Sequence, residues 1–221
     1  NDIDFIIFAT STPDYYIPGS GCILQEKMNF PTIGALDIRN ACTGFIYAIS
    51  IADQFIKNKT YKNILVVTAE VQSTAMNLTN TGRDTSVIFA DGAAATILSA
   101  TQQDEGILST HLHSEGKYLK ELWVEAPSSK ANPKLSQEII DQEKHYLKMN
   151  GREVFKHAVK RFPEVIIEGL KHNNLDVNDI DLLIPHQANV RISKMIQKKL
   201  GLSDNQVISN IHNYGNTTSA S

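Results

Sequence analysis

A short apolar segment occurs twice in this chain, and the repeat constrains the fold more than any other feature of the sequence. Residues 2–8, Asp-Ile-Asp-Phe-Ile-Ile-Phe, return as Asp-Ile-Asp-Leu-Leu-Ile-Pro at residues 179–185. Both runs are typical of buried strands, and each is followed by a helical segment, at about residues 20–27 and 190–200. A Gly or Pro break, another short strand and a further helix start come next in both places. The chain is therefore predicted to contain two copies of one structural unit.

The elements between the two copies favour an α/β fold. Three further strands are expected, at residues 63–69, 87–98 and near 106–113. Helical periodicity covers residues 137–170, with a break at Gly151. Residues 114–133 mix Gly, Pro, Ser and charged residues without a steady period, which predicts a surface loop excursion. Strands that alternate with helices are typical of layered α/β proteins.

Cys42 lies between a short apolar segment and a helix expected from about Thr43 to Lys57, so its thiol is placed at a helix start. Backbone N–H groups and the positive end of the helix dipole favour a thiolate over a thiol, and reactivity follows the thiolate fraction. The helix is apolar on nearly every face, which predicts that it runs through the interior. The sequence therefore indicates a cysteine nucleophile in an enclosed place, with a small buried apolar residue as the alternative.

Two polar residues near the second copy are candidates for the same site. His186 ends the repeated strand in the run Pro185-His-Gln-Ala-Asn189, and strand ends hold chemistry in α/β folds. Asn216 lies close to the position that Cys42 holds in the first copy. A locally hydrogen-bonded histidine and a turn asparagine are the alternatives. The repeat favours two helix starts that face one site.

Composition excludes some function classes. The chain has 221 residues, 42% of them apolar, which is enough to bury a sizeable core. A formal net charge of −3 and a pI near 6.2 argue against a general nucleic-acid partner. Cys22 and Cys42 are the two cysteines, too few for a disulfide scaffold, and no apolar run is long enough to cross a membrane, so a cytoplasmic protein is expected. Both ends of the chain look cut.

Several motifs together resemble the β-ketoacyl-acyl-carrier-protein synthase III family of the thiolase-like superfamily, over essentially the whole chain. The matching runs are Asn40-Ala-Cys42-Thr-Gly-Phe45, Gly82-Arg83-Asp-Thr85 with Phe89-Ala-Asp91-Gly92, Pro185-His186-Gln-Ala-Asn189 and Gly215-Asn216-Thr. The resemblance implies a duplicated, layered α/β/α/β/α fold that is incomplete at both ends. Residues 1–100 would be part of the N-terminal half. Residues 101–221, with the excursion at 114–133, would be part of the C-terminal half.

The resemblance implies that Cys42 is the catalytic nucleophile and that His186 and Asn216 complete the site. The family acylates its cysteine from an acyl-CoA primer and then condenses the acyl group with malonyl-acyl carrier protein, which loses carbon dioxide. This decarboxylative Claisen condensation initiates fatty-acid or related synthesis. Its enolate needs fixed hydrogen-bond donors, a role that the resemblance gives to His186 and Asn216. The family implies a homodimer, with no metal or redox cofactor.

Other roles are implied position by position. Arg83 corresponds to a residue that contacts the coenzyme A nucleotide, and Phe155 and Asn189 correspond to residues that line the pantetheine tunnel. Ile17 matches a residue that reaches the acyl pocket of the partner subunit, where an aromatic side chain is common, so primers larger than acetyl are expected. Arg152 departs from the family pattern, which often has Asn there.

Two basic stripes flank the candidate site at helical spacing. The first comprises Arg191, Lys194 and Lys198, and the second comprises Arg152, Lys156 and Lys160. Acyl carrier protein is acidic, so these stripes would steer it by an attraction that weakens with salt. Arg191 and Lys194 are the predicted docking residues, with ordinary solvated helix faces as the alternative.

Two other functions stay open on the residues alone. The order and spacing of Cys, His and Asn also occur in papain-like cysteine hydrolases, so a hydrolase or thioesterase is one, although the Cys-Gly-Ser-Cys-aromatic signature is missing. A non-catalytic thiolase-fold subunit that only binds acyl carriers is the other, and the intact Cys, His and Asn argue against it. His111 and His113 share a strand face, but the sequence offers no third ligand nearby, so no metal site is predicted.

Overall fold

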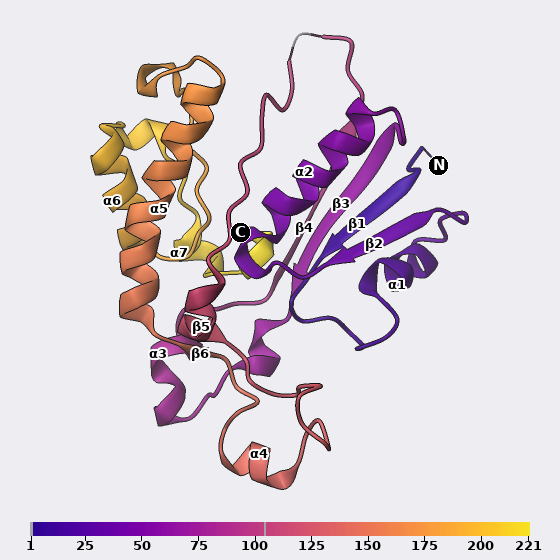
Figure 1. The fold of residues 1–221 in the computed structure, drawn as a ribbon, viewed down its shortest axis with the longest axis vertical. Coiled ribbons are helices and arrows are strands. Elements are labelled where there is room, and N and C mark those ends of the chain that lie inside the picture. Colours follow the sequence, from indigo (N-terminus) through magenta and orange to yellow (C-terminus); the bar gives the residue numbers. More distant parts are fainter. Residues whose placement is uncertain (1, 104) are drawn as a thin grey trace.

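The N-terminal part of the protein is built on a four-stranded sheet. The structure is a computed structural model that describes residues 2–103 and 105–221 (Figure 1). The strands are β1 (Phe5–Ala9), β2 (Gly34–Ile38), β3 (Asn63–Glu70) and β4 (Gly92–Ser99), in the spatial order β2-β1-β3-β4. β1 pairs in parallel with β2 and β3, whereas β4 runs antiparallel along β3. The strands predicted from the first copy and at 63–69 are confirmed.

Two helices cover opposite faces of this sheet. Successive residues of a strand point to opposite faces, so the two helices contact different residues of β1. α1 (Ser20–Lys27) follows β1, and a Cβ added at Gly21 would lie 3.6 Å from the Cβ of Phe8. α2 (Gly44–Lys57) follows β2 and packs on the face that carries Phe5 and Ile7. Both helices form where the sequence predicts them, and the layers are visible in Figure 1.

Asp37 of β2 fixes the start of α1. Its carboxylate accepts the Ser20 N–H at 2.6 Å and the Gly21 N–H at 2.9 Å, which satisfies two backbone donors that the helix itself cannot. A Cβ added at Gly19 would lie 2.6 Å from Asp37 Oδ1. Glycine at this position therefore allows the carboxylate to reach the helix start.

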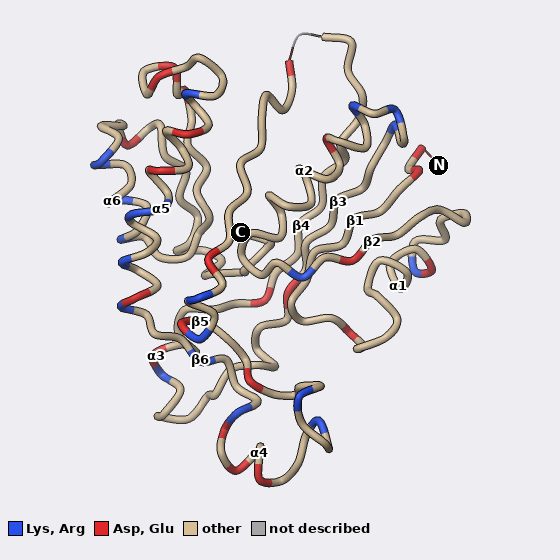
Figure 2. The backbone as a smooth tube through the Cα atoms, viewed as in Figure 1, with Lys and Arg blue, Asp and Glu red and all other residues tan. Residues whose placement is uncertain are grey.

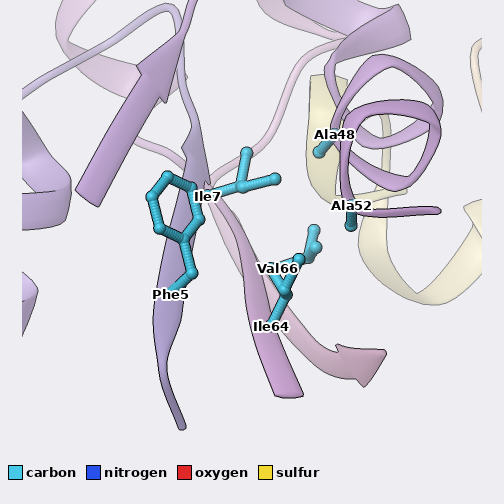
Figure 3. Close-up of a cluster of buried hydrophobic side chains, with 6 residues drawn as sticks. All are labelled: Phe5, Ile7, Ala48, Ala52, Ile64 and Val66. Carbon is cyan, nitrogen blue, oxygen red and sulfur yellow. The ribbon is translucent and has the colours of Figure 1, made fainter. Parts of the chain in front are cut away.

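A stripe of small residues lets α2 approach the sheet closely. Gly44, Ala48 and Ala52 recur at four-residue spacing on one helix face, and neither alanine has any exposed surface. The core that they contact comprises Phe5, Ile7, Ile64 and Val66 (Figure 3). Ile64 and Val66 pair with Phe5 and Ile7 across the parallel ladder, so all four side chains face the helix.

The opposite side of α2 is less covered than the sequence predicts. Phe45 and Ile46 are 37% and 44% exposed within the described residues. An extended segment touches this helix through Ser50 and Thr110, whose hydroxyl oxygens lie 2.9 Å apart. The prediction of a helix enclosed on all sides is wrong for this part of the chain. The sheet covers one face of α2 and a single segment crosses a second face, so Phe45 and Ile46 stay partly exposed.

The C-terminal part is mainly helical, and α5 packs against α6. Its regular elements are β5 (Leu122–Trp123), α4 (Gln137–Asp141), β6 (Lys148–Met149), α5 (Gly151–His172), α6 (Val190–Leu200) and α7 (Ile211–Tyr214). α3 (Arg83–Ser86) precedes β4. The 3-10 turns are η1 (Ala41–Thr43), η2 (Gln72–Ala75), η3 (Asn80–Gly82), η4 (Gly116–Glu121), η5 (Val177–Asp179), η6 (Asp204–Gln206) and η7 (Thr218–Ala220). The helical break predicted at Gly151 is wider than expected, since α4 ends at Asp141.

The second copy of the repeat is less regular than the first. Within residues 179–185, Leu183 alone forms a bridge, a parallel one with Val207. Leu183 N–H donates to Gln206 O at 2.7 Å, and Ile208 N–H donates to Leu183 O at 3.0 Å. In place of the predicted strand, residues 179–185 form only these two ladder hydrogen bonds within the described residues. Residues 206–208 are the one described segment that pairs with them. Residues 106–113 likewise form no ladder, against the prediction of a strand.

Replacing Ala52 with Leu tests the close packing of α2. The added side chain has no room between the helix and the sheet, so we expect Ala52→Leu to lower the free energy of unfolding by about 1–3 kcal/mol. The matched control is Ile46→Leu on the exposed side of the same helix, which should change it by less than about 0.5 kcal/mol. Chemical denaturation measures both. Equal effects at the two positions would contradict the packing described.

Candidate active site

Three parallel strands end at one edge of the sheet, and the predicted nucleophile lies there. β1 leads into Ser11, β2 leads into Cys42 and β3 ends at Glu70. The carboxyl edge of such a sheet is where α/β proteins bind their ligands. β4 begins at the same edge, since Gly92 pairs with Glu70.

Cys42 lies in the 3-10 turn η1, directly before α2. Its neighbour Ala41 has φ of 45°, in the left-handed region that non-glycine residues rarely adopt. Gly44 begins α2, and a Cβ there would lie 3.0 Å from Ala9 Cβ and 3.1 Å from Ser219 Cβ. The turn is therefore held by close contacts with β1 and with a segment distant in sequence.

That distant segment carries Asn216, and it packs against Gly92 at the sheet edge and Gly44 at the start of α2. Asn216 forms a parallel bridge with Phe89: Asn216 N–H donates to Ile88 O at 3.0 Å, and Ala90 N–H donates to Asn216 O at 2.9 Å. A Cβ at Gly92 would lie 2.7 Å from Thr217 Cγ2. The following turn, η7, packs against η1. The structure thus brings the Asn216 segment to the Cys42 turn.

The side chain of Asn216 is 4% exposed and has a fixed orientation. Its Oδ1 accepts the Thr218 N–H at 2.9 Å. Because the amide oxygen is held by this backbone donor, the Nδ2 group points the other way and can donate hydrogen bonds. Thr218 itself has φ of 57°, unusual for a β-branched residue.

His186 is connected to the same segment. Its Nδ1 lies 3.0 Å from Ser221 Oγ, which also donates to Thr218 O at 3.2 Å. The His186 Nε2 and the Thr218 Oγ1 are buried and have no hydrogen-bond partner among the described residues. Burial lowers the pKa of His186, so the imidazole is neutral at neutral pH. Buried polar atoms without partners are expected where a protein binds a ligand.

The ionisation of Cys42 differs from the expectation of a stabilised thiolate. Burial raises the pKa of the Cys42 thiol to about 12, and the negative charge of Glu70 adds to the rise. The helix start does not overcome these effects, because desolvation penalises the charged sulfur and a carboxylate lies nearby. The resting sulfur is therefore a thiol.

Glu70 and Ser219 belong to this site although the sequence interpretation did not single them out. Ser219 Oγ donates to Glu70 Oε1 at 2.8 Å, and both residues are buried at the sheet edge. A glutamate that closes an apolar strand run is the signal that could have indicated Glu70. The partner could not be inferred, because 149 positions separate the two residues.

The residues expected to bind coenzyme A and the primer come from four separate segments of the chain. Arg83 begins α3 and is exposed, and Phe155 is half-buried on α5. Asn189 caps α6, since its Oδ1 accepts the Arg191 N–H at 2.9 Å. Ile17 is 82% exposed in the loop between β1 and α1.

Both predicted basic stripes lie on exposed helix faces. Arg191, Lys194 and Lys198 are exposed on α6, and no salt bridge among the described residues involves them. On α5, Lys156 pairs with Glu153 at 3.1 Å, which offsets part of the positive charge there. Figure 2 shows the basic residues along both helices. The α6 stripe is therefore the stronger positive patch.

His111 and His113 have an ordinary explanation. Both bind Glu168 of α5, at 3.1 and 2.7 Å. Across residues 2–103 and 105–221, no cluster of three or more His, Cys, Asp or Glu side chains has the arrangement of a metal site.

A cavity of about 350 Å³ lies beside His111, between α5 and residues 180–183, and none of Cys42, His186 and Asn216 lines it. In the described part of the chain no helix has the length and apolarity to cross a membrane.

Comparisons with known proteins agree with the motifs. Residues 36–116 match the family model described as 3-oxoacyl-[acyl-carrier-protein] synthase III, and residues 170–221 match the model of its C-terminal part. β-Ketoacyl-[acyl-carrier-protein] synthase III from Clostridium perfringens is 41% identical over the whole chain, and the enzyme of that name from Clostridioides difficile is 42% identical. The chain spans 66% of the length of each of these relatives.

Solved structures of synthase III also resemble this chain. Synthase III from Aquifex aeolicus has a TM-score of 0.87 and 37% identity, with 99% of this chain and 65% of that one covered. Synthase III from Thermus thermophilus has a TM-score of 0.89 and 33% identity, with 100% and 66% covered. The predicted thiolase-like α/β fold is confirmed by this likeness. On the combined evidence of motifs, fold and relatives, the chain belongs to the 3-oxoacyl-[acyl-carrier-protein] synthase III family.

Proposed function

We propose that the protein of which this chain is part catalyses the decarboxylative Claisen condensation of an acyl-CoA primer with malonyl-acyl carrier protein. The observation that carries the proposal is the docking of the Asn216 segment, η7, against η1 with Cys42, with His186 tied to the same segment through Ser221. Relatives of the chain are named for this synthase activity and not for hydrolysis. Cys42, His186 and Asn216 are the proposed catalytic residues.

The first half-reaction would acylate Cys42. The thiol sulfur attacks the thioester carbonyl of the acyl-CoA, a new carbon–sulfur bond forms, and the bond to coenzyme A breaks. His186 is neutral and its Nε2 has no hydrogen-bond partner in residues 2–103 and 105–221, so it is suited to accept the thiol proton and to pass it to the departing coenzyme A sulfur. A base is needed here because the resting Cys42 is protonated.

The second half-reaction would form the carbon–carbon bond. The malonyl carboxylate leaves as carbon dioxide, and its electron pair becomes an enolate whose oxygen accepts hydrogen bonds from Asn216 Nδ2 and His186 Nε2–H. The enolate carbon attacks the acyl-enzyme, the carbon–sulfur bond breaks, and the Cys42 sulfur regains a proton from solvent. The Ser221 hydroxyl can accept from or donate to His186 Nδ1, so it supports both tautomers that the two steps require.

Substrate contacts and assembly form the outer part of the proposal. Arg83, Phe155 and Asn189 would bind coenzyme A, with Asn189 also capping α6. Ile17 would reach the acyl pocket of a partner subunit in a homodimer, which its exposure supports. Residues 1–100 and 101–221 would form parts of the two halves. The two free cysteines support a cytoplasmic location.

Mass spectrometry of the full-length protein tests the proposal. Mixing with acyl-CoAs of increasing chain length should add one acyl group to Cys42, and malonyl-acyl carrier protein should then convert it to a β-ketoacyl product. The Cys42→Ala variant should do neither. Release of free acid without condensation would overturn the proposal in favour of a hydrolase, and the range of accepted primers would test the role of Ile17.

The resting thiol predicts a particular pH dependence for alkylation of Cys42. Below a pKa of about 12 the thiolate fraction rises about tenfold per pH unit. Iodoacetamide labelling of the full-length protein should therefore accelerate up to about pH 10 without a plateau. A Cys22→Ser background removes labelling at the exposed second cysteine. A plateau near neutral pH would show a resting thiolate instead.

Asn216→Ala should separate the two half-reactions. Loss of one oxyanion donor typically costs about 10²–10³ in rate, and this loss should fall on condensation because the enolate forms only there. The acyl-enzyme should accumulate, as measured by mass spectrometry during turnover. Asn178→Ala, at an exposed asparagine, is the matched control. Equal losses in both half-reactions would contradict the assigned role.

Charge reversal at Arg191 should weaken the binding of the carrier protein and leave acylation by acyl-CoA intact. Arg191→Glu should raise the Michaelis constant for malonyl-acyl carrier protein by about tenfold at low salt, with a smaller effect at high salt. Acylation by acyl-CoA should be unchanged. Lys171→Glu, at the far end of α5, is the control. An unchanged Michaelis constant would exclude α6 as the docking surface.

A further inference from the structure

Glu70 is a buried carboxylate that the proposed mechanism does not use. It ends β3, is 2% exposed, and accepts hydrogen bonds at both oxygens. Its donors come from three separate segments: Ser11 N–H at 3.2 Å, Ser11 Oγ and Thr12 Oγ1 at 2.9 Å, Gln72 Nε2 at 3.2 Å and Ser219 Oγ at 2.8 Å. Because every partner is a donor, the group acts as an ionised acceptor.

The fold alone does not explain a charge at this position. Among the described residues no lysine, arginine or histidine forms a salt bridge with Glu70. A buried charge balanced only by neutral donors is expensive, and an apolar residue of similar size commonly holds a core equally well. The carboxylate therefore has to be explained by what its hydrogen bonds hold in place.

Those hydrogen bonds join the segments that meet at the candidate site. Ser219 lies in η7, three residues after Asn216, and its Cβ lies 3.1 Å from where a Cβ at Gly44 would be. Its hydroxyl also approaches Ala9 O at 3.4 Å. Ser11 and Thr12 begin the loop that leads to Ile17. One carboxylate thus contacts the Asn216 segment, the end of β3 and the start of the Ile17 loop.

We propose that Glu70 is a positioning residue, which holds the Asn216 segment against the Cys42 turn through Ser219 and holds the start of the Ile17 loop through Ser11 and Thr12. This inference rests on the proposed function, because it assigns Glu70 a task in the same site. Loss of the Ser219 contact would let Asn216 shift relative to the thiol. A shift of about 1 Å in a reacting group is enough to cost about 100-fold in rate.

Ser219→Ala in the full-length protein tests the contact between the two segments. Condensation should fall by about 10- to 100-fold, whereas acylation of Cys42 by acyl-CoA should stay within about threefold of the wild type. The matched control is Ser99→Ala, which removes a serine hydroxyl that donates to Asn63 Oδ1 at 2.7 Å on β3. Equal losses in both half-reactions, or no loss in either, would overturn the proposal.

Glu70 variants separate positioning from simple stability. In a Cys22→Ser background, Glu70→Gln removes the charge near Cys42, so iodoacetamide labelling of Cys42 should become at least about threefold faster at a given pH, while condensation falls. Glu70→Asp keeps the charge and should leave the labelling profile unmoved. Glu70→Gln could instead lower only the stability of the protein, with the wild-type labelling profile and the wild-type ratio of the two half-reaction rates. That result would show a purely structural role for Glu70.

The labelling readout needs no substrate, so it distinguishes the two hypotheses. If the wild-type protein neither acylates nor condenses, the proposed function fails, and the labelling profiles still report whether Glu70 acts on Cys42. If the wild type is active and the Glu70 and Ser219 variants match it in both half-reactions, the positioning role fails alone.

Discussion

The structure depends on the close approach of residues 215–219 to the carboxyl edge of the four-stranded sheet. Glycines at positions 44 and 92 leave room for Ser219 and Thr217, and a short parallel bridge fixes Asn216 beside Phe89. A Cβ at Gly92 would lie 2.7 Å from Thr217 Cγ2, so the two segments would have to shift, and a Cβ at Gly44 would press on Ser219 Cβ at 3.1 Å. This contact joins the part of the chain that carries Cys42 to the part that carries Asn216 and His186, so the candidate active site exists only where the two parts meet.

The electrostatics of this centre are unusual because its charge lies beside the reacting atoms and not on them. Cys42 is held as a thiol and His186 as a neutral imidazole, both mainly through burial. Glu70 carries a negative charge that accepts hydrogen bonds from four neutral residues, Ser11, Thr12, Gln72 and Ser219. A neutral pair is cheaper to bury than an ion pair, and it postpones charge separation until a substrate is present.

The sequence predicted the local elements well, because their signals are local. The apolar run at β1, the helix starts at Ser20 and Val190 and the strand at Asn63 appear where periodicity and breaks indicate them. The second-copy strand was predicted from its apolar run and its likeness to residues 2–8, but a ladder requires neighbouring strands, and Leu183 has one bridge. The pKa of Cys42 and the Glu70–Ser219 contact depend on residues far apart in sequence, so no local pattern could give them.

The strand that delivers the nucleophile also anchors the neighbouring helix. Asp37 holds the first N–H groups of α1 through two short hydrogen bonds, and the same strand runs on through η1 to Cys42. The loop with Ile17 enters α1 directly before those bonds. Removal of the Asp37 carboxylate, on the same strand that leads to the thiol, would therefore leave two N–H groups at the start of α1 without their acceptor.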